Sequence, residues 1–263
     1  MSNSTTNDGF HVDRHSSVAT VTIDRPKANA LDAATSRLLG EAFIELDADP
    51  QVRVIIITGA GDRFFSAGWD LGAAGDGEAF DSDYGAGGFG GFPDLAHRST
   101  PVIAAVNGMA VGGGFEIAMA ADLIVAADHA LFFLPEGGLG LLPDAGSVRL
   151  PALLPPHIAR EMLLTGRRMD AHEAARWGLI NAVVPAAELV ASAGALAQRV
   201  IASAPLSVAA MLDIGRRTVG IEPITAMGVI KGLDSYRLAI DSHDAVEGVN
   251  ARRDQRAPEW GGR

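Results

Sequence analysis

The stretch that decides the fold is AVNGMAVGGGFEIAMAADL, residues 105–123. Three glycines, 112–114, stand directly before an apolar segment that carries one carboxylate, Glu116. Glycine costs backbone entropy and an acid is unfavourable among apolar side chains, so this combination needs a reason. A helix that begins at the glycines would offer free N–H groups to an anionic oxygen at close approach. The alternative is a tight strand-to-helix turn in which Glu116 stabilises the helix dipole.

The segments around this stretch alternate between strands and helices, which predicts an α/β fold. Nearly continuous apolar runs at 52–59 and 100–108 are typical of strands buried on both faces, and residues 18–23 alternate as a strand should. Asp32 is a suitable N-cap for a helix over 33–47. Shorter strands are expected at 122–128 and 130–136. From residue 145 onward the pattern predicts helices broken by prolines, over 145–154, 157–165, 171–176, 187–203, 206–219, 223–240 and 243–253.

These patterns divide the chain into three regions. We expect a flexible N-terminal tail over 1–9, a core over 10–200 and a helical C-terminal region over 201–263. Residues 72–92 are too rich in glycine for regular structure and are expected to form a long mobile loop. Within that loop GAGGFG, residues 85–90, matches G-x-G-x-x-G formally. It neither follows a strand nor opens a helix, which argues against a dinucleotide site.

Composition and the remaining motifs exclude several function classes. The chain of 263 residues has no cysteine, which excludes disulfides, thiolate nucleophiles and cysteine zinc sites. Its net charge of −11 argues against nucleic-acid and anionic-membrane partners. It contains no P-loop and no G-x-S-x-G elbow, and its seven histidines lack metal-ligand spacing. Without a signal-peptide pattern or an apolar run of about 18 residues, a cytoplasmic location is expected.

Two further segments carry chemistry next to predicted strands. FFSAGWDL, residues 64–71, is a turn that can offer a second backbone N–H, and FLPEGGLGLLPDAG, residues 133–146, places Glu136 after a proline in apolar surroundings. Two backbone donors and two carboxylates suit a reaction through an enolate. The donors would hold the enolate oxygen, while the acids would manage water and a proton beside it.

From about residue 10 to its end the chain resembles the enoyl-CoA hydratase/isomerase (crotonase) superfamily. The resemblance implies a spiral of ββα units with a helical C-terminal trimerisation region. It also implies that the thioester carbonyl oxygen binds the amides of Trp69 and Gly113, with Glu116 and Glu136 as the acid pair. Members that only shift double bonds generally need the second acid alone, so two acids favour hydration or dehydration. No metal or organic cofactor is implied, because coenzyme A is part of the substrate.

The resemblance also implies which residues contact coenzyme A and how the chain assembles. The contacts fall on Arg25, Lys27, Ala28, Ala67, Asp70, Leu71 and Gly112. The alternative for Lys27 is an exposed loop lysine, and for Asp70 a turn cap. A homotrimer or a dimer of trimers is expected, with an acyl-CoA thioester as substrate and no nucleic-acid or membrane partner.

A combination of segments resembles one subgroup more specifically, that of the carnitinyl-CoA dehydratases (crotonobetainyl-CoA hydratases). These segments are DRPKANALD (24–32), FFSAGWDL (64–71), GAGGFGGF (85–92), LTGRRMDAHEAARWGLIN (164–181), HDAVEG (243–248) and APEWGGR (257–263). A trimethylammonium group needs aromatic faces or a nearby negative charge. Trp69, Phe89, Phe92, Tyr84, Asp83 and Asp144 lie in suitable segments. Alternatively, these aromatic residues merely anchor the glycine loop.

Two departures from the superfamily pattern leave other readings open. PDAGSVRLP, 143–151, has Ser147 near the place of a second glycine and is one residue short, which would reshape the acyl pocket. The last helix lacks an aromatic residue and a lysine that relatives place against a neighbour's coenzyme A, where Arg252, Arg253 or Arg256 could substitute. The alternative functions are a generic short-chain enoyl-CoA hydratase of fatty-acid oxidation and a non-catalytic acyl-CoA-binding protein.

Overall fold

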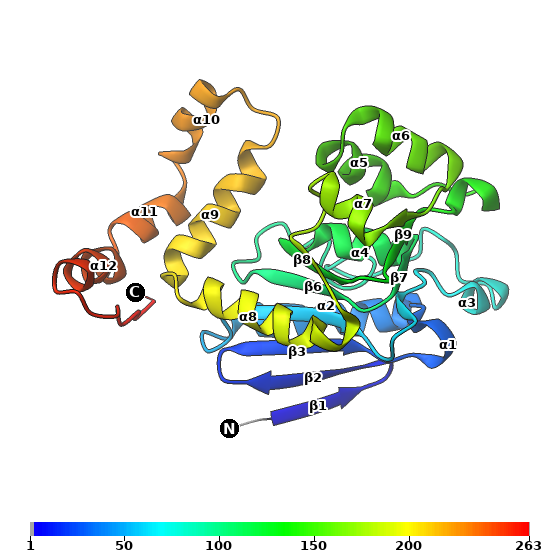
Figure 1. The fold of residues 1–263 in the computed structure, drawn as a ribbon, viewed down its shortest axis with the longest axis horizontal. Helices are drawn as coiled ribbons and strands as arrows, with labels where there is room; N and C mark the ends of the chain where they lie inside the picture. Colours follow the sequence, from blue (N-terminus) through cyan, green and yellow to red (C-terminus); the bar gives the residue numbers. More distant parts are fainter. Residues whose placement is uncertain (1–2, 263) are drawn as a thin grey trace.

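The computed structural model describes residues 3–262 and contains two sheets (Figure 1). The larger sheet has the strand order β1-β2-β3-β4-β6-β8-β11. Pairing is antiparallel from β1 to β3 and parallel from β3 to β11. The strands are β1 Asn3–Asn7, β2 Phe10–His15, β3 Val18–Ile23, β4 Val54–Gly59, β6 Val102–Val106, β8 Leu123–Ala127 and β11 Ala182–Val184.

The smaller sheet positions the site. Its order is β10-β9-β7-β5, with β10 Met169–Asp170, β9 Leu131–Phe133, β7 Met109–Val111 and β5 Phe64–Ser66. β5, β7 and β9 are parallel neighbours, whereas β10 runs antiparallel to β9. The carboxyl ends of three adjacent strands therefore meet at one edge, which is where ligands bind in open α/β sheets.

Helices cover both sheets and extend beyond them at the C-terminus (Figure 1). α8 packs its buried residues Leu189, Ala193 and Ala197 against the larger sheet. α9 to α12 reach away from the two sheets as a separate arm. The helices are α1 Pro26–Asn29, α2 Ala33–Ala48, α3 Leu71–Gly75, α4 Gly113–Ala120, η1 Glu136–Leu139, α5 Asp144–Leu153, α6 Pro156–Thr165, α7 Ala171–Arg176, η2 Ala186–Glu188, α8 Leu189–Ile201, α9 Pro205–Thr218, α10 Pro223–Ile230, α11 Asp234–Ile240 and α12 His243–Arg253.

The main sequence predictions are confirmed. The alternating strand appears as β3 and the two buried strands as β4 and β6, and the glycine triplet follows β7 and opens α4. Asp32 caps α2 by accepting a hydrogen bond from the Thr35 amide at 2.7 Å. α4 is nearly all buried, since Phe115 and Ile117 pack in the same core as Val21 of β3. Continuous apolar runs form strands that are covered on both faces, and helices provide that cover in an α/β fold.

Three predicted segments differ in the structure. In place of a tail over 1–9, residues 3–7 pair with β2 through a turn at Asp8-Gly9, where Gly9 has φ +88°; residues 1 and 2 lie outside the described part. An Asp-Gly turn is a strong hairpin signal. The predicted helix 223–240 is two helices, since α10 ends at Ile230 and α11 begins at Asp234, with Gly232 between them. The loop 72–92 opens with the short helix α3 rather than with irregular chain.

No single helix of residues 3–262 combines the length and apolar character that crossing a membrane requires. The consecutive segments Ala186–Ile201 and Pro205–Thr218 meet those criteria only when taken together, and they are bent by 102°.

Candidate active site

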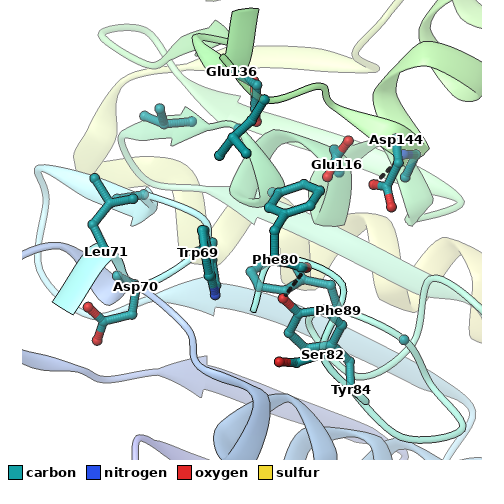
Figure 2. A pocket seen from close by; sticks show the side chains of 18 of the residues that line it. Trp69, Asp70, Leu71, Phe80, Ser82, Tyr84, Phe89, Glu116, Glu136 and Asp144 are labelled. Atoms are coloured by element: carbon teal, nitrogen blue, oxygen red, sulfur yellow. Dashed lines mark hydrogen bonds between the residues drawn. The ribbon is translucent and has the colours of Figure 1, made fainter. Parts of the chain in front are cut away.

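A cavity of about 710 Å³ opens at the carboxyl edge of the smaller sheet (Figure 2). Trp69 enters it after β5, Gly113 after β7 and Glu136 after β9, and Glu116 joins them from α4. Its volume lies within the range of small-molecule pockets. The segments 64–71, 105–123 and 133–146, which only the family resemblance linked, therefore meet because β5, β7 and β9 are parallel neighbours.

The backbone amide of Trp69 is left free by the pairing around it. Leu31 donates its N–H to the Gly68 carbonyl at 2.8 Å and accepts from the Asp70 amide at 2.9 Å. In such a bridge the groups of the two flanking residues face the partner chain, so the N–H of the residue between them faces away. The Trp69 N–H has no acceptor anywhere in residues 3–262. It is a free donor on a residue that lines the cavity.

The Gly113 amide is free because it is the first residue of α4. Gly112 donates to the Phe133 carbonyl, and its own carbonyl accepts from the Phe115 and Glu116 amides, whereas Gly113 N–H finds no acceptor among the described residues. Gly112 adopts φ 53°, ψ −126°, a conformation that suits glycine. Gly68 packs beside the triplet, since a Cβ on it would lie 2.7 Å from Gly113 N. The two free amides therefore belong to backbone segments in direct contact.

Glu116 is held inside the cavity wall. Only 7% of the residue is exposed, and its Oε1 accepts a hydrogen bond from the Gly146 amide at 2.6 Å. Burial is the main cause that raises the pKa of Glu116 to about 7; the Gly146 N–H and Arg149 oppose the rise, and the nearby carboxylates of Asp144 and Glu136 add to it. Such a group changes its protonation state near neutral pH, as a general acid or base must.

Glu136 opens η1 on the other side of the glycine triplet. It is 7% exposed, and its Oε2 has no hydrogen-bond partner among the described residues. Burial raises its pKa above the ordinary glutamate value, its own backbone amide lowers it, and Asp144 raises it again. A Cβ on Gly112 would overlap its Oε1, so glycine is what allows this carboxyl to sit there. A buried polar atom without a hydrogen-bond partner is costly unless a ligand satisfies it.

Aromatic side chains from the glycine-rich loop form one wall of the cavity. Trp69 and Phe80 meet edge to face with centroids 5.5 Å apart, and Tyr84 and Phe89 do so at 5.2 Å. Glu78 secures this wall, because it accepts a hydrogen bond from the Trp69 indole at 2.8 Å. It also accepts from the Ala33 amide at the start of α2. Glu78 therefore anchors the glycine-rich loop 72–92 to the start of α2.

The charges that line the cavity have one sign. None of its lining residues is lysine, arginine or histidine. Burial and the neighbouring acids Glu78, Asp144 and Asp81 raise the pKa of the Tyr84 hydroxyl to about 12. Its lining carboxyl groups are Asp70, Asp83, Asp94, Glu116, Glu136 and Asp144.

The residues implied for coenzyme A separate into two groups. Ala67, Asp70, Leu71 and Gly112 line the cavity. Arg25, Lys27 and Ala28 do not line it, although Ala28 accepts a hydrogen bond from the Ala67 amide at 2.9 Å. The guanidinium of Arg25 pairs with Asp32 at 2.7 Å and Asp70 at 3.3 Å. Arg25 therefore connects the loop 24–32 to the turn that carries Trp69, a contact that the sequence did not reveal.

The residues considered for a trimethylammonium group also divide. Trp69, Phe89, Tyr84, Asp83 and Asp144 line the cavity, but Phe92 does not. Phe92 packs in the core against Phe43, with ring centroids 4.6 Å apart, because the loop turns inward beside α2.

Sequence reasoning missed three residues of the site: Gly146, Glu78 and Phe80. Gly146 lies in the segment 143–151 that departs from the family pattern. Glycine fits there because a Cβ would lie about 3.1 Å from Glu116 Oε1. Glu78 and Phe80 stand in a loop without periodicity, so only tertiary contacts reveal them. Arg256 lies beyond the end of α12 and donates hydrogen bonds to both carboxylate oxygens of Glu247 in that helix, at 2.6 and 2.8 Å.

This architecture, with two free amides and two buried glutamates at one sheet edge, is that of the crotonase fold class. The chain belongs to the enoyl-CoA hydratase/isomerase family, whose model matches residues 13–263. It is 52% identical over 259 residues to carnitinyl-CoA dehydratase from Escherichia coli strain K12, covering 97% of this chain and 99% of that protein. The enzyme of the same name from Salmonella typhi shows the same identity and coverage.

Solved structures with this fold include enoyl-CoA hydratases from two other bacteria. That from Mycobacterium tuberculosis H37Rv aligns with a TM-score of 0.90 at 37% identity, covering 98% of this chain and all of that one. That from Bacillus anthracis aligns with a TM-score of 0.89 at 31% identity, covering 97% of this chain and all of that one. The spiral ββα fold predicted from the sequence is confirmed.

Proposed function

We propose that this protein is an acyl-CoA hydro-lyase that adds water across, or removes it from, the α,β-carbons of a coenzyme A thioester. The observation that carries the proposal is the shared cavity of Glu116, Glu136 and the free amides of Trp69 and Gly113. Amides that lack acceptors can hold an oxyanion, and acids with raised pKa values can exchange protons at neutral pH. Relatives named as hydratases and dehydratases support the same reaction class.

In hydration, the thioester carbonyl oxygen accepts hydrogen bonds from the Trp69 and Gly113 amides. Negative charge moves onto that oxygen as the water oxygen bonds to the β-carbon. Ionised Glu116 takes the proton that the water loses, and protonated Glu136 gives its proton to the α-carbon. A proton then passes back to Glu136 before the next cycle, so the net change is the addition of one water.

The electrostatics of the cavity are consistent with different roles for Glu116 and Glu136. Two acids that share a cavity resist being ionised together, because each charge raises the other's pKa. Glu116 keeps one hydrogen bond to a backbone amide, which stabilises its ionised form, whereas Glu136 has an oxygen without any partner among the described residues. Glu136 can exchange the proton of the α-carbon through that oxygen, and Glu116, whose pKa is about 7, can take the proton of the water at neutral pH.

The acyl group we propose is that of carnitinyl-CoA or crotonobetainyl-CoA. Its trimethylammonium group is a cation without a hydrogen-bond donor, so it is recognised by aromatic faces and negative charge. The cavity supplies both and presents no basic side chain. The 52% identity to carnitinyl-CoA dehydratases over almost the whole chain supports the same acyl group.

The assay is hydration of crotonobetainyl-CoA and crotonyl-CoA, followed by loss of the enoyl-thioester absorbance. We expect a higher kcat/KM for crotonobetainyl-CoA. A tenfold or larger preference for crotonyl-CoA would identify a generic short-chain enoyl-CoA hydratase instead, which is the second candidate because the same machinery serves it. Binding of several acyl-CoA esters without hydration, dehydration or isomerisation would mark a non-catalytic acyl-CoA-binding protein.

The assembly we propose is a homotrimer or a dimer of trimers. α9 to α12 leave large apolar side chains uncovered, among them Val219, Ile224 and Val249, which are 73%, 82% and 69% exposed. An exposed apolar surface of this kind marks an interaction site. Light scattering coupled to size-exclusion chromatography tests the proposal, with three or six chains expected and a monomer contradicting it.

Arg25, Lys27 and Ala28 are proposed to contact coenzyme A from the first loop, beside the cavity mouth. Lys27 is exposed and free of an ion-pair partner among the described residues, so it can approach a phosphate. The Lys27→Ala variant should bind coenzyme A esters more weakly, as titration calorimetry can show; unchanged affinity would leave Lys27 as an ordinary loop lysine.

A further inference from the structure

We infer that Asp144, Phe89 and Tyr84 form a quaternary-ammonium subsite that selects the acyl group. This inference rests on the proposed hydratase function and assigns its acyl specificity to particular residues.

The Phe89 ring borders the proposed oxyanion site. A Cβ on Gly113 would overlap this ring, so the ring lies against the residue whose amide is free. Tyr84 meets Phe89 at an interplanar angle of 86°, and its hydroxyl is held by the Phe80 carbonyl at 2.7 Å. Two aromatic faces at right angles thus stand next to the position of the reacting carbons.

Asp144 supplies the negative charge on the same side. It is the first residue of α5 and lines the cavity, and Figure 2 shows its carboxylate beside Glu116. Its charge raises the pKa of Glu116, Glu136 and Tyr84, so it acts on both acids and on the aromatic wall. Its Oδ1 accepts a hydrogen bond from the Ala145 amide at 2.7 Å, which fixes the side chain at the helix start.

The length of the acyl group matches this placement. In a crotonobetainyl thioester the nitrogen lies two bonds beyond the β-carbon, about 2.5 Å away by ordinary bond lengths. A β-carbon between Glu116 and Glu136 therefore puts the cation within the reach of the wall that Phe89, Tyr84 and Asp144 form. A neutral acyl group of the same shape would leave the Asp144 charge without a counter-charge.

The unpaired oxygen of Glu136 gives a second, independent sign that this cavity is built for a ligand. The residue is more than nine-tenths buried, and Oε2 finds no donor among residues 3–262. No basic side chain lines the cavity, although Arg25 pairs with Asp70 from outside it. A cationic ligand would place a counter-charge beside the lining carboxyl groups.

The test compares two substrates of equal shape, crotonobetainyl-CoA and 5,5-dimethylhex-2-enoyl-CoA, in which carbon replaces the quaternary nitrogen. The readout is the ratio of their kcat/KM values in the wild type and in Asp144→Asn, Phe89→Leu and Asp94→Asn. Asparagine keeps the acceptor for the Ala145 amide, so Asp144→Asn removes charge alone. Asp94 lines the cavity but is not among the groups that shift the pKa of Glu116, Glu136 or Tyr84, which makes Asp94→Asn the matched charge control.

We expect the ratio to favour the cationic substrate in the wild type and to fall at least about tenfold in Asp144→Asn and severalfold in Phe89→Leu, as loss of a nearby counter-charge and of a cation–π contact implies. In Asp94→Asn it should stay within about threefold of the wild type, because Asp94 does not belong to the cluster of Asp144, Phe89 and Tyr84. An unchanged ratio in Asp144→Asn, or an equal fall in Asp94→Asn, overturns the subsite while leaving the hydratase proposal intact. A wild type that hydrates neither substrate overturns both.

Discussion

Replacing Glu116 with glutamine should stabilise the folded protein above pH 7 while removing its hydratase activity. The carboxyl group is 7% exposed and has a pKa of about 7. Because this value lies above the ordinary value of 4.5, the folded state holds the proton more tightly than the unfolded state does. Wild-type stability therefore falls as pH rises from 4.5 to 7, and the full cost of burying the ionised carboxylate is present above pH 7.

The size of this cost follows from the pKa. At about 1.4 kcal/mol per pKa unit, a rise from 4.5 to about 7 corresponds to at most about 3 kcal/mol. Glutamine does not titrate, and its amide oxygen can still accept the hydrogen bond that the Gly146 N–H now donates at 2.6 Å. The variant thus avoids the charge without losing the contact.

Urea denaturation at fixed protein concentration, at pH 5 and pH 8.5, measures this effect in the wild type and in Glu116→Gln. The gain of the variant should be larger at pH 8.5 than at pH 5 by up to about 3 kcal/mol. Glu41→Gln, at an exposed position of α2, is the control and should show no such difference. A pH-independent gain, or a loss at pH 8.5, refutes the assignment of a raised pKa to Glu116.

Three further variants test other parts of the site. Glu136→Gln should lower kcat by about 10²- to 10⁴-fold while the Kd of an acyl-CoA changes little, since an amide cannot exchange the α-proton; a variant that keeps a third of the wild-type kcat contradicts this. Gly112→Ala should lower the free energy of unfolding by about 1–3 kcal/mol because of its positive φ, with kcat falling as the new Cβ displaces Glu136; denaturation and steady-state kinetics measure both. Glu78→Ala should cost about 1.5–3 kcal/mol, because two hydrogen bonds to a charged group are lost, and should shift the Trp69 fluorescence to longer wavelength; an unchanged spectrum speaks against the anchor.

The sequence predicted those features that depend on local pattern. Apolar runs identified the buried strands β4 and β6, alternation identified β3, and Asp32 marked the start of α2. The glycine triplet before Glu116 identified a strand-to-helix turn, because few other patterns justify that cost in backbone entropy. Glu136 was found by its apolar surroundings and by the family resemblance. Local chemistry thus sufficed for the residues that stand directly after strands.

The remaining features depend on contacts between distant segments. Nothing in the sequence tells that Gly146 donates to Glu116, or that Glu78 joins Trp69 to the start of α2. Phe92 and Phe89 stand three residues apart in the same glycine-rich loop, yet one packs in the core and the other lines the cavity. The ion pairs of Arg25 with Asp32 and Asp70 likewise join segments that are distant in the sequence.

The most direct measurement of the central claim is a crystal structure with a bound acyl-CoA thioester. The account predicts the thioester oxygen about 3 Å from both the Trp69 and Gly113 nitrogens. It also predicts the β-carbon between the carboxyl groups of Glu116 and Glu136. A thioester oxygen that contacts neither nitrogen, or a β-carbon that lies away from both acids, would contradict it.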